Sequence, residues 1–195
     1  MHAGIVLSDR LANGAGFVRW ASGNINTVFS EIATPVPGSY IANIFKEEHL
    51  NDCDSACYEC LKVYRNMTYH GLLDWRLGIS YLKTLLNPNY LAGLDGNFNS
   101  RELDGWLENA TLQRDRFAGE FGFTPRNFGE LPGFEAGSVP VILIHPLWDI
   151  RDPQRILAMA TAEATISSPM VSFLDTFNIS RRPGECYRAL LQIAG

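Results

Sequence analysis

Three of the four cysteines in this chain lie within eight residues, at Cys53, Cys57 and Cys60. Thiolates two to four residues apart can turn their sulfurs toward one point, about 2.3 Å from a zinc ion. Disulfides explain the group less well, because four cysteines in 195 residues are far fewer than a disulfide-rich secreted scaffold carries. Ordinary buried thiols are the other alternative, but polar residues separate these three. We therefore expect a Zn²⁺ site.

A tetrahedral structural zinc needs four ligands, and these cysteines supply three. His70 is the favoured fourth ligand, ten residues beyond Cys60. Cys186 is the distant alternative and would tie the C-terminal region to the site. His49 is a third candidate, on the near side. If the protein supplies only three ligands, a water would complete the site and leave it open for chemistry.

Further residues flank the cysteines in a characteristic order. They are the segment 7–17 (LSDRLANGAGF), then Leu61, Tyr64, Asn66 and His70, and the segment 73–76 (LDWR). Together with Cys53, Cys57 and Cys60 they resemble the zinc-binding domain at the C-terminus of MrfA-type and DISARM-type DNA helicases. The resemblance covers roughly residues 3 to 86, and the segment 175–183 resembles the tail of large defence helicases.

This resemblance implies a non-motor part of an ATP-dependent DNA helicase that acts in DNA repair or in bacterial defence against phage. The implied partners are a helicase motor subunit or domain, and DNA through that complex. In the family four cysteines hold the zinc. Here Cys53, Cys57 and Cys60 match three of them, while Asn51 departs from the pattern.

The chain itself lacks the parts of a motor. A helicase needs a phosphate-binding loop of the G-x4-G-K-[ST] kind, and no Gly-Lys pair occurs in the sequence. A chain of 195 residues also has no room for two motor domains of ordinary size. The sequence therefore predicts an accessory module, or a detached C-terminal part of a helicase, without catalytic residues of its own.

The net charge of −5 and the pI near 5.3 bear on the partners. Phosphate backbones attract Lys- and Arg-rich surfaces, so tight direct DNA binding by the isolated chain is disfavoured. Arg181 and Arg182 could still meet a phosphate or a partner carboxylate, although two solvated arginines at a surface turn are the simpler interpretation. Apolar runs such as residues 141–144 are too short to cross a membrane, which predicts a soluble, cytoplasmic protein.

The predicted fold class is α/β in the mixed α+β sense, with a zinc-stapled helical N-terminal half and a small α/β C-terminal half. We expect domains over residues 1–90 and 98–195, separated by a polar hinge at 87–99. The sequence predicts a strand at 4–7, then helices over 17–32 with a break near Gly23, around 45–50, and over 73–86. It predicts a helix from about residue 100 to 118, a long loop over 122–138, strands at 139–145 and 170–174, and helices over 153–165 and 183–191.

A hydrolase, for instance a nuclease, is the alternative function. The C-terminal half places several chemistry-bearing residues in predicted loops or at strand ends, where catalytic groups often lie. These residues are Glu130, Glu135, His145, Asp149 and Asp175. Carboxylates and a histidine could bind magnesium and position a water, provided that they converge in a single cleft.

Overall fold

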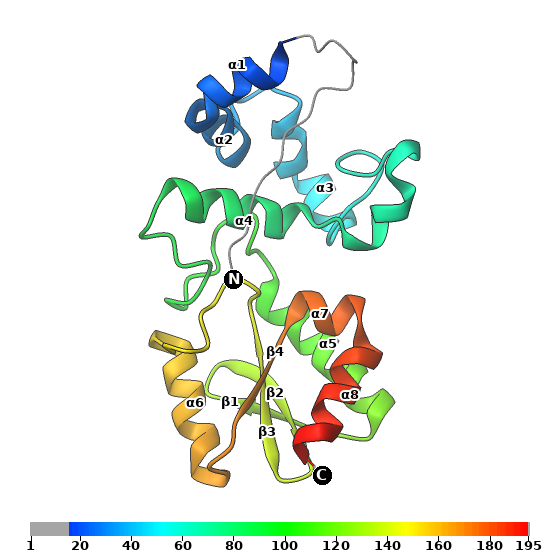
Figure 1. The fold of residues 1–195 in the computed structure, drawn as a ribbon, viewed down its shortest axis with the longest axis vertical. Helices are drawn as coiled ribbons and strands as arrows, with labels where there is room; N and C mark the ends of the chain where they lie inside the picture. Colours follow the sequence, from blue (N-terminus) through cyan, green and yellow to red (C-terminus); the bar gives the residue numbers. More distant parts are fainter. Residues whose placement is uncertain (1–15, 195) are drawn as a thin grey trace.

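The computed structural model of this chain describes residues 16–194 and contains a helical N-terminal part and an α/β C-terminal part (Figure 1). The predicted mixed fold class is thus confirmed. The strand predicted at residues 4–7, and most of the segment 7–17, lie outside the described residues. The elements of the N-terminal part are α1 (Phe17–Gly23), α2 (Ile25–Ala33), η1 (Ile41–Phe45), α3 (Glu47–Asp52), η2 (Tyr64–Leu72) and α4 (Trp75–Leu86).

The helix predicted over 17–32 is divided at Asn24, whose backbone (φ −125°, ψ 27°) is not helical. The longest helix of this part, α4, begins where the Asp74 carboxylate accepts a hydrogen bond of 2.9 Å from the backbone N–H of Leu77. This cap satisfies one of the free amides of the first turn. The buried face of α4 packs against α2 and carries Trp75 and Ile79 into a small core near the cysteines.

The C-terminal part is a four-stranded sheet between helices. Its elements are α5 (Trp106–Phe121), β1 (Thr124–Phe128), β2 (Leu131–Ala136), β3 (Val139–Ile144), α6 (Arg155–Ser167), β4 (Ser172–Asp175), α7 (Thr176–Arg181) and α8 (Pro183–Ala194). The strand order is β1-β2-β3-β4. The first three strands are antiparallel, and β4 runs parallel to β3 after the α6 crossover.

Strand β3 is buried on both faces, as its continuous apolar sequence predicts. Val141 and Leu143 face a core formed with α5, α7 and α8. Ile142 and Ile144 face a second core formed with α6. In Figure 1, α6 accordingly covers one face of the sheet while α5 and α8 cover the other.

The prediction of a long loop over residues 122–138 is wrong, because the β1–β2 hairpin lies in this segment. The glycine and proline residues of this segment suggested a loop, yet Pro125 and Gly133 are both compatible with their positions in the strands. Pro125 lies on an edge strand, where a missing N–H costs little. Gly133 pairs with Ile142, and a Cβ on it would collide with the carbonyl oxygen of Val141 and the ring of Phe128. The glycine thus permits the hairpin rather than breaking it.

Residues 90–98, within the predicted hinge, contribute to the C-terminal core. Ala92 is buried, and Tyr90, Leu94 and Phe98 pack around the same cluster. The Trp148 indole N–H donates a 2.9 Å hydrogen bond to the carbonyl of Ala92. The division into domains 1–90 and 98–195 stays a prediction. Within the part that the structure covers, none of the helices combines the length and the hydropathy needed to cross a bilayer.

Candidate metal centre

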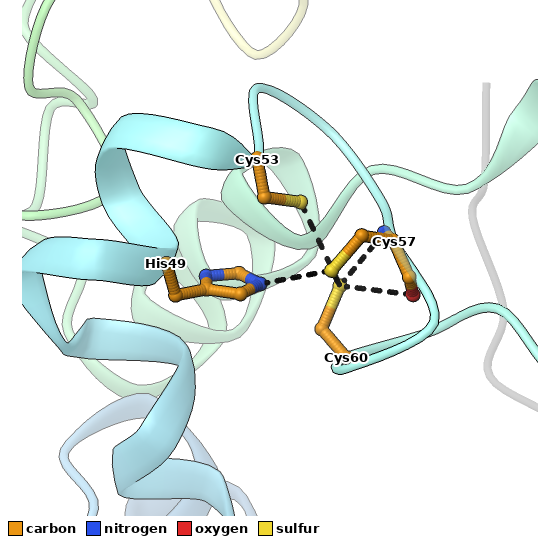
Figure 2. A group of neighbouring side chains, drawn as sticks. All are labelled: His49, Cys53, Cys57 and Cys60. Atoms are coloured by element: carbon orange, nitrogen blue, oxygen red, sulfur yellow. Dashed lines mark hydrogen bonds between the residues drawn. The ribbon is translucent and has the colours of Figure 1, made fainter.

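Four side chains from α3 and the loop that follows it meet at one point (Figure 2). They are His49, Cys53, Cys57 and Cys60, whose potential ligand atoms all lie within 4.8 Å of one another. His49 projects from α3, and Cys53 follows the last residue of that helix. Because His49 and Cys53 are four residues apart on one helical turn, their side chains lie on the same face. Cys57 and Cys60 return to that face from the loop.

Three of the six distances between these atoms match those expected around a tetrahedral ion. Bonds of about 2.3 Å to sulfur and about 2.0–2.1 Å to nitrogen would place two sulfurs about 3.8 Å apart, and a sulfur and a nitrogen about 3.6 Å apart. The Sγ atoms of Cys53 and Cys60 are 3.8 Å apart, and those of Cys57 and Cys60 are 3.7 Å apart. The His49 Nε2 lies 3.5 Å from the Cys57 Sγ. All three distances fit, and the four thiols of the chain are free of disulfides.

Backbone contacts hold the ligands in place around this point. The Cys57 N–H donates to the Cys60 sulfur at 3.1 Å, and the Lys62 N–H closes the turn on the Cys57 carbonyl at 2.9 Å. The His49 Nδ1 lies 2.9 Å from the carbonyl oxygen of Ile44, which fixes the tautomer with the proton on Nδ1. That tautomer leaves the Nε2 lone pair free to face the sulfurs, as in most metal-bound histidines.

The start of α4 supports the loop from behind. The Trp75 indole N–H donates to the Cys53 carbonyl at 3.2 Å, and its backbone N–H donates to the Ser55 carbonyl at 2.8 Å. Its ring lies 5.6 Å from the imidazole of His49. The Arg76 guanidinium donates to the Leu50 carbonyl at 3.3 Å. The segment LDWR therefore positions both sides of the cluster.

Protons compete with a cation for this cluster. Burial raises the pKa of the Cys53 thiol, and the neighbouring sulfurs of Cys57 and Cys60 raise it further. A bound divalent cation would reverse that effect, because the thiolate and not the thiol is the ligand. Metal binding is thus coupled to proton release.

The structure brings His49 to the cluster, where the sequence favoured His70. The His70 Nε2 instead lies 2.8 Å from the Asn66 Oδ1 and 3.1 Å from the Val63 carbonyl oxygen, as part of the η2 turn. Cys186, the distant alternative, is buried against the sheet in the core of α5 and α8. The signal for His49 is its i, i+4 relation to Cys53 on a short helix, which gives the pattern H-x3-C-x3-C-x2-C.

The two arginines at the end of α7 have different surroundings. Arg181 is mostly buried and donates a 3.2 Å hydrogen bond to the Leu73 carbonyl, which links α7 to the start of α4. Arg182 is exposed and its nearest acidic group is Glu185, at 3.9 Å. Arg182 therefore matches the simpler interpretation of a solvated arginine, whereas Arg181 connects the two parts of the fold.

Three of the carboxylates considered for a hydrolase each interact with a different partner. Glu135 pairs with Arg126 at 2.6 Å on the hairpin. Asp149 pairs with Arg151, and Asp175 caps α7 through the Asn178 N–H at 2.8 Å. Over residues 16–194, the His/Cys cluster is the one group of three or more His, Cys, Asp or Glu ligand atoms that lie this close together.

His145, at the end of β3, makes stability depend on pH. Burial lowers its pKa from 6.5 to about 4, and the charge of Glu102 opposes this only in part. Between these two values the unfolded chain binds a proton that the folded chain does not. The free energy of unfolding should therefore fall as the pH drops from 6.5 toward about 4.

Urea unfolding from pH 7 to pH 4.5 tests this expectation. The comparison is between the wild type and His145→Gln, whose amide can still accept the Leu147 N–H bond that Nδ1 accepts now. The variant should show a flatter loss of stability with acid, and the difference between the two profiles separates His145 from the metal ligands, which also bind protons. Parallel profiles would contradict a neutral, buried His145.

Comparisons with known proteins complete the description of the site. No family model, no curated protein and no solved structure matches this chain.

Proposed function

We propose that this chain is a zinc-stabilised, non-catalytic accessory module that acts with an ATP-dependent DNA helicase. The observation that carries the zinc assignment is the convergence of His49, Cys53, Cys57 and Cys60, whose potential ligand atoms all lie within 4.8 Å of one another. Thiolate and imidazole ligands suit Zn²⁺, and four protein ligands close its coordination sphere. A closed site of this kind stabilises a fold and leaves no position for a substrate or a reactive water.

The link to a helicase rests on the sequence resemblance over residues 3 to 86, and the contacts of its motif residues support it. Asp74, Trp75 and Arg76 form the start of α4 and hold the cysteine loop. Asn66 and His70 close the η2 turn beside that loop. The motif residues thus act together as one framework for the metal. Free thiols in this number also suit a reducing compartment such as the cytoplasm.

Metal content per chain tests the zinc assignment. The wild type, purified without a chelator, should carry one zinc per chain by plasma mass spectrometry. His49→Ala should lose it, whereas His49→Cys, which restores four ligands, should keep it. His70→Ala is the matched control and should also keep its zinc. Zinc-free wild-type protein, or loss of zinc only in His70→Ala, would overturn the assignment of these four ligands.

Copurification tests the helicase part separately. A tagged chain produced in its native cells should retain a protein with helicase motor domains, and mass spectrometry of the eluate would identify it. Cys57→Ser should lose that partner. Stoichiometric zinc without any motor protein would leave the metal site standing and remove the helicase assignment.

A further inference from the structure

A cleft of about 550 Å³ lies where the metal-bearing part meets the sheet. Its walls come from the cysteine loop, the start of α4, the first half of α5, the end of β3 and helix α7. Its volume falls in the range of about 300–1,000 Å³ that is typical of small-molecule sites. Five segments distant in the sequence thus converge on one concave surface.

The cleft lies at the carboxyl ends of the two parallel strands. His145 follows the last residue of β3, and Thr176 follows the last residue of β4, and both line it. Ligands of open α/β sheets bind in the crevice beyond the carboxyl ends of the strands, where loops and helix starts present polar groups. The topology therefore places the cleft where such a fold offers a binding site.

Unpartnered polar atoms gather in the residues that line this cleft. Among residues 16–194, three buried side-chain atoms have no hydrogen-bond partner, and they belong to Trp106 (Nε1), Gln113 (Oε1) and Arg181 (Nε). All three residues line the cleft. Leaving a buried polar group unpaired is unfavourable, so such atoms call for an explanation. A bound ligand would supply their partners.

Two of the three atoms are donors, and three arginines line the same cleft: Arg76, Arg116 and Arg181. Trp106 offers an indole N–H and Arg181 a guanidinium N–H. Arg116 is exposed at the cleft and has no acidic partner within 4 Å in the described part of the chain. The Nδ1 atom of His145 accepts the Leu147 N–H, so its neutral ring presents a donor at Nε2. Such a set of donors recognises anionic oxygen atoms.

Acidic residues in the same walls limit the size of the anion. Glu102 is neutralised by Lys83, and Asp74 lies 3.9 Å from Arg181. Asp54, Asp104 and Glu108 also line the cleft and have no salt-bridge partner within 4 Å in the described part of the chain, although the Arg76 guanidinium lies near Asp104. These charges would repel a nucleic-acid backbone with its row of phosphates. They would tolerate a compact ligand whose single anionic group meets the arginines.

We propose that this cleft binds a small ligand through one phosphate or carboxylate group, held by Arg116, Arg181 and the indole N–H of Trp106. The four candidate metal ligands do not line the cleft, and the proposal does not depend on the helicase assignment. Gln113 and the acidic residues would contact the rest of the ligand and favour groups that donate hydrogen bonds.

Calorimetric titration of the metal-loaded chain tests this proposal with four probes: inorganic phosphate, succinate, adenosine monophosphate and a single-stranded oligonucleotide. At least one small probe should bind. Tighter binding of phosphate identifies a phosphate group as the ligand chemistry, and tighter binding of succinate identifies a carboxylate. If adenosine monophosphate binds more tightly than inorganic phosphate, the site also contacts the nucleoside, and the ligand class is a nucleoside phosphate.

Two variants locate the binding without touching the internal contacts of Arg181. Arg116→Gln should raise the Kd tenfold or more, because a charge-assisted bond is worth about 1.5–3 kcal/mol. Trp106→Phe keeps an aromatic ring beside Phe98 and removes the N–H together with the five-membered ring of the indole, so it should weaken binding severalfold. Arg188→Gln on α8 is the control with the same charge change and should bind as the wild type does.

Three outcomes would overturn the proposal. One is the absence of binding heat from every small probe up to about 10 mM, a concentration at which a ligand with a Kd of about 1 mM would occupy most of the sites. Another is binding that survives both Arg116→Gln and Trp106→Phe. The third is binding of the oligonucleotide alone.

Discussion

Cys57→Ser is expected to release the metal and to unfold the segment from about residue 41 to 72, while the sheet remains folded. The core beside the cluster is small: five buried residues, Ile44, Leu50, Cys53, Trp75 and Ile79, with Cys57 and Cys60 packed against them. Structural zinc contributes on the order of 10 kcal/mol of apparent binding free energy that is also folding free energy. Whole domains are stable by only about 5–15 kcal/mol. The metal-bearing part therefore cannot stay ordered without its ion.

Hydrogen exchange measured by mass spectrometry can resolve this local unfolding. Peptides that contain the Cys53 and Trp75 amides, which donate to the carbonyls of His49 and Ser55, should lose their protection. Peptides from β3 should keep it, because both of its faces are buried by other elements. A chelator added to the wild type should give the same pattern.

Cys186→Ala is the matched control, since this thiol is buried in the other core. It should keep both its zinc and the protection near Cys53. Unchanged exchange in Cys57→Ser, with the metal gone, would mean that the cluster does not hold this part of the fold together.

The same site should release its metal as the pH falls. Ligand thiols must lose their protons to bind, and burial raises the pKa of Cys53, so protons compete strongly there. Metal transfer to a coloured chelator should therefore be faster and more complete at pH 5.5 than at pH 7.5. His70→Ala should show the same dependence as the wild type, because its ring lies outside the cluster.

The three cysteines and the need for a fourth ligand could be predicted from spacing alone. Which histidine completes the set could not, because that depends on the course of the chain between residues 44 and 53. His49 reaches the sulfurs since α3 ends beside Cys53 and the Ile44 carbonyl holds its ring. His70 lies ten residues beyond Cys60, and its ring is held by Asn66. Side-chain distances decide between them, and the sequence does not contain these directly.

In the C-terminal part, too, some elements could be predicted from the sequence and others could not. The order of β3, α6, β4 and α8 follows from apolar runs and proline positions, which are local signals. The β1–β2 hairpin was missed because its stability comes from pairing across strands. Gly133 looks like a breaker in the sequence, and only its close contact with Val141 explains why a side chain is excluded. The cleft likewise depends on segments that meet only in three dimensions.

A buried ion pair joins the two parts of the chain and gives the last prediction. The Glu102 side chain is fully buried and receives hydrogen bonds of 2.8–2.9 Å from Lys83 of α4 and of 2.8 Å from Tyr90 and Ser100. Burial favours the neutral acid, but these bonds outweigh it and lower the pKa of Glu102. The carboxylate is therefore charged at neutral pH, with the Lys83 ammonium beside it.

Lys83→Met should lower the free energy of unfolding by about 3–5 kcal/mol at pH 7, because it leaves a buried carboxylate without its cation. Adding Glu102→Gln to Lys83→Met removes that charge while keeping acceptors and shape for Tyr90 and Ser100. The double variant should therefore be more stable than Lys83→Met alone. A second mutation that restores stability distinguishes an electrostatic cost from the loss of packing by the lysine stem.

Urea unfolding followed by tryptophan fluorescence provides the four free energies of this double-mutant cycle. The electrostatic origin of the destabilisation in Lys83→Met can also be tested by changing the pH. In Lys83→Met the buried carboxylate should take up a proton more readily than in the wild type, so the deficit of this variant should shrink as the pH falls from 7 toward 5. If Glu102→Gln instead added its own cost to that of Lys83→Met, the two side chains would act independently. The contact between α4 and residues 98–105 would then depend on the surrounding apolar packing rather than on this charge pair.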